Sequence, residues 1–317
     1  MSDQQQDEVN LNDAYKNIVE NQENSEANEP VNLGSVNMER YNTQKAQDAD
    51  VHLGYHAIDE KGLPSGGRFY PEDAKISVRA AKVGEIRNFS IVDETNLVDM
   101  EEKLNYIVKN CVRITSGKKK LSYKDILEED RFYILLSIRD LTFPEPENKL
   151  MTQARDKDGL EFDVEISAKY FQLSTIPADI EKYYSHESRS FLIETKSFGT
   201  IEMAPPTIGI METVTDYIKT KQINGGQWDQ AFLQVLPYIQ QDWRGFNERS
   251  IFQGEIDFQG WSERKYMLVY RLAEKMRVGI KPEMLVQHED GEVLVPINFR
   301  DGLKSLFIIS DITGELL

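Results

Sequence analysis

Two periods organise the apolar positions of this chain from residue 61 onward. Ile76 and Val78 alternate with polar neighbours, which is the two-residue period of a half-buried strand. The next segment changes to helical spacing and carries one apolar stripe: Leu97, Met100, Leu104, Ile107, Val108 and Cys111. A second helix is predicted to begin near Ser122, which forms a capping-box-like pair with Asp125, and to stop before Pro144.

Turn signals predict hairpins in the later part of the chain. Asp158-Gly159 and Asp290-Gly291 each join two alternating segments, and Phe198-Gly199 separates short β segments at 191–195 and 201–203. Glu255 and Asp257 alternate with apolar neighbours, which favours a further strand face over a catalytic acid–base pair.

Three more helices are predicted after residue 205. The first opens at Pro205-Pro206 and is broken by Asn224-Gly225-Gly226. The next contains Pro237, so we expect a kink or an early end, and the last begins at Ser262. The segment 303–309 is apolar and fits either a helix or a strand.

This succession predicts an α+β fold with small antiparallel β elements and several amphipathic helices, preceded by a disordered acidic N-terminal tail. Residues 1–60 are rich in Asp, Glu, Asn and Gln, so they bury too little apolar surface to offset their ordering entropy. An arm that folds onto a neighbouring subunit is the alternative. We expect one domain over 61–223 and a C-terminal α/β region over 224–317, and the pattern leaves open whether that region is a separate small domain.

Composition narrows the class of protein. The formal net charge of −17 argues against a nucleic-acid binder, which needs Lys and Arg in excess. No apolar run approaches the roughly 18 residues of a membrane span. The single cysteine, Cys111, cannot form an intramolecular disulfide, and its place on an apolar stripe favours a buried small hydrophobe over a reactive thiol. We therefore expect a cytoplasmic protein, or a component of a particle assembled there.

Motifs for catalysis or cofactor binding are not found: there is no phosphate-binding loop, dinucleotide fingerprint or nucleophile elbow. His52 and His56 are four residues apart, but Gly54 lies between them, so we expect no metal site. The acidic run Glu128-Glu129-Asp130 and the basic run Lys118-Lys119-Lys120 are interpreted as solvated surface. We expect no catalytic residue, cofactor or metal.

Aromatic residues gather in one stretch, which contains Trp228, Tyr238, Trp243 and Phe246 with Arg244 among them. Core packing is one interpretation. The alternative is a partner-binding anchor, since Trp, Tyr and Arg dominate interface hot spots.

The order of segments from Leu63 resembles the T4-like bacteriophage base plate protein family, which includes baseplate hub assembly proteins. The opening Leu63-Pro64-Ser65-Gly66-Gly67-Arg68-Phe69-Tyr70 is similar to that family's Leu-Pro-Ser-x-Gly-x-x-Tyr, and Asp130-Arg131 begins a segment similar to its Asp-Arg-x-x-Leu-Leu-x-x-Arg helix. The strand 76–79 followed by Gly84-Glu85, and the helix ending Asn110-Cys111-Val112, are two further pieces, and the resemblance covers about residues 61–220. Relatives often carry paired cysteines around the hairpin, and residues 149–164 have none here, so a metal is not expected.

The resemblance implies a non-enzymatic structural or assembly protein of the baseplate hub of a contractile tail. It would dock to other tail proteins in the host cytoplasm and persist in the virion if structural. The alternative is a transient chaperone of the tape-measure protein. The candidate interaction residues are Leu63, Pro64, Tyr70, Trp228, Trp243, Arg244 and Phe246. An enzyme with a site built from scattered residues is the competing class. Partners are expected to be proteins, and neither nucleic acid nor membrane.

Overall fold

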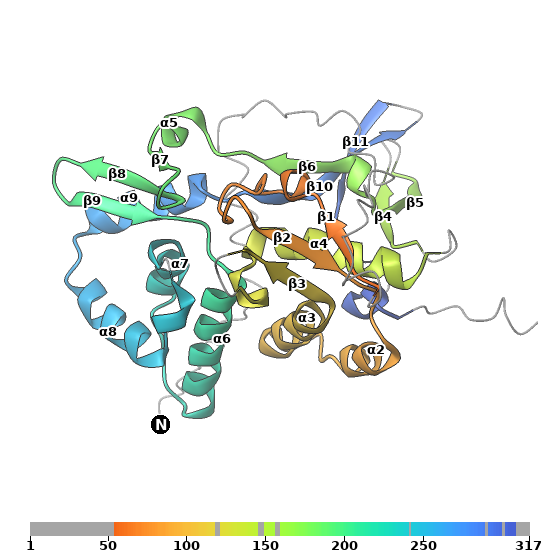
Figure 1. Ribbon diagram of the computed structural model, residues 1–317, viewed down its shortest axis with the longest axis horizontal. Coiled ribbons are helices and arrows are strands. Elements are labelled where there is room, and N and C mark those ends of the chain that lie inside the picture. Colours follow the sequence, from red (N-terminus) through yellow and green to blue (C-terminus); the bar gives the residue numbers. More distant parts are fainter. Residues whose placement is uncertain are drawn as a thin grey trace, which may run out of the picture. The chain divides into compact units, whose positions relative to one another are not determined.

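The computed structural model describes residues 54–117, 121–144, 149–155, 159–240, 242–288, 291–299 and 302–308. These ranges form an α+β fold in which small antiparallel sheets are interleaved with helices, as predicted (Figure 1). The calls for residues 1–53, for Lys118-Lys119-Lys120, and for Pro146, Asp158 and Asp290 lie outside the described residues.

Short helices join longer amphipathic ones along the described chain. The α-helices are α2 (Val83–Ser90), α3 (Leu97–Cys111), α4 (Glu128–Thr142), α5 (Ala178–Glu181), α6 (Ile208–Ile223), α7 (Gln230–Ile239), α8 (Glu248–Gln259) and α9 (Glu263–Lys275). The 3-10 helices are η4 (Glu60–Gly62), η5 (Tyr123–Asp125), η6 (Ala168–Tyr170), η7 (Trp243–Gly245) and η8 (Leu303–Leu306).

Two three-stranded antiparallel sheets belong to the first core. One has the order β1 (His56–Ile58), β2 (Lys75–Val78), β3 (Val112–Thr115), and the register aligns Ile58, Ile76 and Ile114. The other has the order β11 (Gly291–Pro296), β10 (Gly279–His288), β6 (Phe171–Ser174). Because β1 is already paired, the ordered fold begins before residue 61, where we had placed its start.

Two predicted hairpins complete the strands. β4 (Met151–Arg155) pairs with β5 (Glu161–Glu165), and β8 (Ser190–Thr195) pairs with β9 (Gly199–Met203) and with β7 (Tyr184–Ser185). The hairpin of β10 and β11 is also confirmed.

Buried apolar side chains form three clusters. The first core spans the chain from Ile58 to Phe307 and is built around Ile76, Phe89, Ile107, Ile134, Ile138 and Met284. The second core is Ile180, Phe191, Ile193, Met203, Val235, Tyr238, Val269, Leu272, Ala273 and Met276. The third core is Ile210, Val214, Tyr217, Phe232, Leu233, Leu236, Phe246 and Ile251. Phe69 packs against the first and second cores, and Phe258 against the second and third.

The C-terminal region shares its packing with the earlier residues. β10 pairs with β6, and Met284, Val295 and Phe307 are buried in the first core. The described residues all fall within one compact unit, Asn32–Leu317. Asn224-Gly225-Gly226, where the predicted C-terminal region begins, lies in the loop between α6 and α7.

Three helical predictions hold in detail. The apolar stripe predicted from Leu97 to Cys111 forms α3, and Cys111 is fully buried at its end. Ser262 caps α9 by accepting from Lys265 N. Pro237 lies in the last turn of α7, which ends two residues later.

The predicted strand at Glu255 is wrong, because these residues belong to α8. Ile251 and Phe258, seven residues apart, face the third core together with Glu255. Glu255 is held on this inner face because it accepts from the Tyr217 hydroxyl at 2.5 Å and from Asp229 N at 3.1 Å. A polar residue on the buried face is what made a helix look like an alternating strand.

The capping box at Ser122 begins η5 and not α4. Ser122 and Asp125 cap each other as expected, but Ile126 and Leu127 are extended and buried. Leu127 bridges Thr207, and Ile208 N donates to the Ile126 carbonyl at 2.7 Å. This tertiary pairing delays the helix to Glu128.

Candidate functional site

The seven predicted interaction residues lie in two places. Leu63, Pro64 and Tyr70 are in the loop of residues 63–70 and are buried. The other four lie on or near the third core: Trp228 and Trp243 are half-buried, Phe246 is buried, and Arg244 is exposed. Burial of Leu63, Pro64, Tyr70 and Phe246 favours a packing role for them. Arg244, with Trp243 beneath it, is the member of the set most open to a partner.

The loop of residues 63–70 is fastened to the first turn of α4 by one carboxylate. Asp130 accepts from Ser65 N at 2.9 Å, from Ser65 Oγ at 2.7 Å and from the Tyr70 hydroxyl at 2.7 Å. Tyr70 in turn accepts from Leu127 N at 3.1 Å. Gly66 and Gly67 adopt φ of 66° and 73°, as predicted for a glycine-dependent turn. The buried network therefore joins residues that are some sixty positions apart.

Burial controls the protonation of this network. It raises the pKa of Asp130, while the hydrogen bonds from Tyr70 and Ser65 act in the opposite direction. Burial, followed by the nearby Asp130 charge, also raises the pKa of Tyr70 well above its ordinary value. Tyr70 is therefore a neutral donor, and its proton points to Asp130 because the Leu127 amide occupies its acceptor side.

Other residues of the same loop contact the second core and its neighbours. Arg68 pairs with Glu181 at 2.5 Å, and the Tyr184 hydroxyl donates to the Arg68 carbonyl at 2.7 Å. The Phe69 ring packs edge-on against Tyr184, with 5.7 Å between centroids. One short loop thus contacts both cores.

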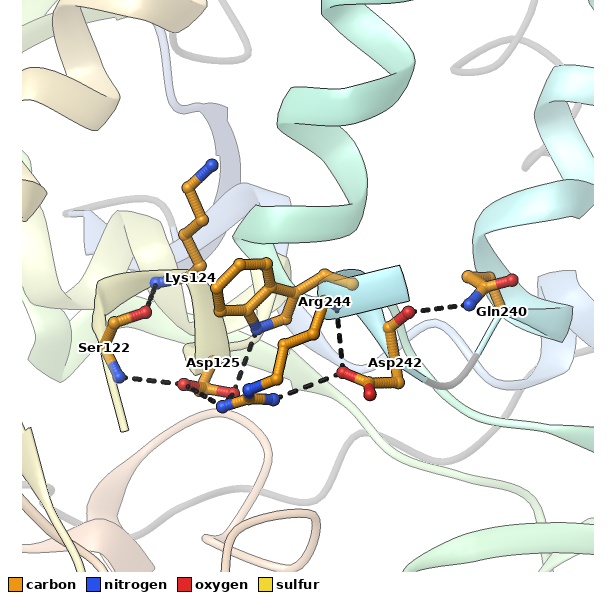
Figure 2. A network of polar contacts seen from close by, with 7 residues as sticks. Ser122, Lys124, Asp125, Gln240, Asp242 and Arg244 are labelled. Carbon is orange, nitrogen blue, oxygen red and sulfur yellow. Dashed lines mark hydrogen bonds and ion pairs between the residues drawn. The ribbon is translucent and has the colours of Figure 1, made fainter. Parts of the chain in front are cut away.

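A second polar network fastens η7 to η5 (Figure 2). Trp243 Nε1 donates to Asp125 Oδ1 at 3.0 Å, and Arg244 Nη2 donates to both Asp125 oxygens at 2.8 and 3.0 Å. Asp242 caps η7 through Arg244 N and also accepts from Arg244 Nη1. Figure 2 shows the Arg244 guanidinium between Asp125 and Asp242. The Asp125 that caps its own short helix therefore also fixes the position of η7.

The Trp243 ring lies against the start of α6. A Cβ added at Gly209 would meet Trp243 Cγ at 2.7 Å and Lys124 Cβ at 2.8 Å, so glycine is required by this close approach. Lys124 Nζ and Arg244 Cζ lie 5.4 and 4.8 Å from the ring centroid, within cation–π range. The Arg244 side chain stays 46% exposed. The arrangement presents a guanidinium backed by an aromatic ring, with its charge already balanced by Asp125 and Asp242.

The acidic run at the start of α4 is the feature that sequence reasoning misjudged. We expected a solvated face, yet Asp130 is fully buried, and Glu128 and Glu129 are half-buried. Arg131 is also buried and pairs with Glu128 at 2.6 Å and with Glu101. The charges of these residues predicted a solvated face, yet no residue of α4 is exposed.

A small apolar surface on α8 was also missed. Phe252 and Ile256 are 51% and 47% exposed and lie one helical turn apart. The incorrect strand assignment hid this spacing. Both side chains face away from the third core, which Ile251 and Gly254 contact instead.

Chemistry beyond packing is sparse among the described residues. They contain no cluster of three His, Cys, Asp or Glu side chains placed to hold a metal. His186 packs edge-on against Tyr184, and His288 lies on the Phe162 ring. Of the helices in this part of the chain, none combines the length and apolar character needed to cross a bilayer.

Comparisons of the chain with protein-family models, with curated proteins and with solved structures found no match. The resemblance to the T4-like base plate family therefore stays a prediction from the residues.

Proposed function

We propose that this chain is a non-enzymatic structural or assembly protein of the baseplate hub of a contractile phage tail, and that it acts by docking to other tail proteins. The contact between the loop of residues 63–70 and Asp130 is the observation that carries the proposal. These are two of the pieces on which the resemblance rests. Their meeting in one buried network supports reading them as parts of a single structural motif.

The use of the motif side chains supports a non-catalytic role. Ser65 and Tyr70 donate to Asp130, and Asp130 is fully buried. A nucleophile or general base needs access to substrate, which these three groups lack. Their hydrogen-bonding groups are used to hold the loop of residues 63–70 against α4.

Exposed groups at two places are suited to docking. Phe252 and Ile256 form an apolar surface on α8, and Arg244 is exposed over Trp243. Aromatic and Arg side chains are enriched at protein interfaces. We propose that tail proteins bind through these side chains.

Quantitative mass spectrometry of purified phage particles and of the infected-cell lysate tests the proposal. Stoichiometric presence in the particle is expected for a structural baseplate component. Presence in a lysate complex with the tape-measure protein, and absence from the particle, would instead favour the transient chaperone. A chain that stays free of all tail proteins throughout assembly would contradict both roles.

A further inference from the structure

The carboxylate of Glu129 has one oxygen in a buried position that offers it no hydrogen-bond donor among the described residues. Glu129 is the second residue of α4, and an added Cβ at Gly279 of β10 would lie 3.4 Å from Glu129 Cβ. Its Oε2 atom is buried, and no hydrogen-bond partner for it is found among the described residues. A buried ionised oxygen without a donor is costly, whereas the neutral carboxyl avoids most of that cost.

The groups that face Glu129 do not compensate its charge. Glu128 and Asp130 flank it on α4, and both are acidic. From the segment between α9 and β10 comes Arg277, which already pairs with Glu274 at 2.7 Å. From α7 comes Tyr238, whose hydroxyl is engaged with Arg277. Arg277, which approaches the carboxylate, is thus shared with Glu274 and Tyr238.

We propose that Glu129 is a proton-dependent latch between α4 and β10, closed when its carboxyl is neutral and loosened when it ionises. The neutral side chain lets α4 pack against β10, where Glu129 lies beside Gly279. An ionised side chain would draw in water or move toward Arg277, and either movement separates these elements.

The direction of the pKa agrees with this geometry. Burial raises the pKa of Glu129 well above its ordinary value of 4.5, and the charges of Glu128 and Asp130 raise it further. Its own backbone amide and Arg277 act in the opposite direction. Since the folded pKa lies above the unfolded one, this group favours folding fully below pH 4.5. That contribution is lost as pH rises through the folded pKa.

The thermal midpoint as a function of pH tests the latch with Glu129→Gln, which keeps the shape and removes the charge. Between pH 4.5 and 8 the unmodified chain should lose stability more steeply than the variant. At pH 8 the variant should melt higher by about 2–4 °C or more, and the two curves should converge near pH 4.5. Glu263→Gln is the matched control, an exposed acid in the first turn of α9, and it should follow the unmodified chain.

Two results would overturn the proposal: a variant curve parallel to that of the unmodified chain, or a variant that melts lower at pH 8. If Glu129→Gln fails to fold, hydrogen exchange of the unmodified chain decides the question. Protection of the β10 amides, corrected for intrinsic exchange, should be weaker at pH 8 than at pH 5.5, and unchanged protection would refute the latch. The inference is independent of the proposed function and can fail or stand without it.

Discussion

At the scale of single residues, acids with little exposure join parts of the chain that are far apart in sequence. Asp130 fastens a loop, Asp125 fastens η7, and Glu255 receives a tyrosine hydroxyl inside α8. Each of these carboxylates accepts hydrogen bonds from residues that are distant in the sequence. The sequence analysis singled out Tyr70, and the structure shows that its hydroxyl bonds to Asp130 and Leu127. Sequence alone could not predict the burial of Asp130, because no local pattern reveals a partner sixty residues away.

Removal of the Tyr70 hydroxyl measures how much the hydrogen bonds around Asp130 contribute to the free energy of unfolding. Tyr70→Phe leaves the Leu127 amide without its acceptor and removes one donor to Asp130, so it should cost about 1–3 kcal/mol in chemical denaturation. Combined with Asp130→Asn, the two losses should be less than additive, because both remove the same bond. Fully additive losses would show that Tyr70 and Asp130 act separately.

The pKa of Glu85 is shifted in the opposite direction to that of Glu129, so its effect on stability should change with pH in the opposite sense. The hydrogen bonds from Arg79, at 2.6 and 2.9 Å, lower the pKa of Glu85 to about 2. A lowered folded pKa gives stability that is present above pH 4.5 and is lost as pH falls toward 2. Glu85→Gln should therefore destabilise the chain by about 1–2 kcal/mol at pH 7. That gap should narrow in urea titrations below pH 4.5, and a gap independent of pH would contradict the assigned ion pair.

At the scale of elements, hydrophobic periodicity was a good guide wherever one face of an element is buried. It located α3, α6 and α9, and the turn signals located three hairpins. It failed where tertiary contacts override the local pattern. Extended pairing at Ile126 and Leu127 delays α4, and the buried Glu255 disguises α8. α2 was missed, although Glu85 completes a capping interaction with Lys82 at its start.

Two helical glycines should respond in opposite ways to the same substitution. Gly209→Ala places a methyl group against Trp243 and Lys124 at less than 3 Å, so it should cost about 1–3 kcal/mol through overpacking. Gly84 has no atom within 4 Å of an added Cβ, and Gly84→Ala should stabilise α2 by about 0.5–1 kcal/mol. Equal effects of the two substitutions in a thermal melt would show that α6 and η7 do not approach closely.

At the scale of the whole described fold, the segment of residues 122–131 links the cores. Asp125 reaches η7, Leu127 reaches Thr207, and Asp130 reaches the loop of residues 63–70. Strand pairing between β6 and β10 also joins distant parts of the chain, and it is invisible in a local pattern. Composition and turn signals could indicate helix ends, but not which distant strands pair.

Substitution of Trp243 distinguishes a role in core packing from a role in binding a partner protein. Trp243→Ala should cost about 2–3 kcal/mol, since the half-buried ring loses its contacts at Gly209 and its bond to Asp125. Trp243→Phe is the control that keeps much of the ring packing, and it should cost less. A normal urea transition for Trp243→Ala, together with failed binding to tail proteins, would assign the ring to a partner instead.

The central claim is that this chain helps to build the baseplate by docking, and loss of the chain tests it most directly. Phage unable to produce it should be examined by electron microscopy of infected-cell lysates and scored for complete baseplates. The account predicts that complete baseplates disappear and that normal particles return when the chain is supplied in trans. Complete contractile tails in normal number without the chain would contradict the account.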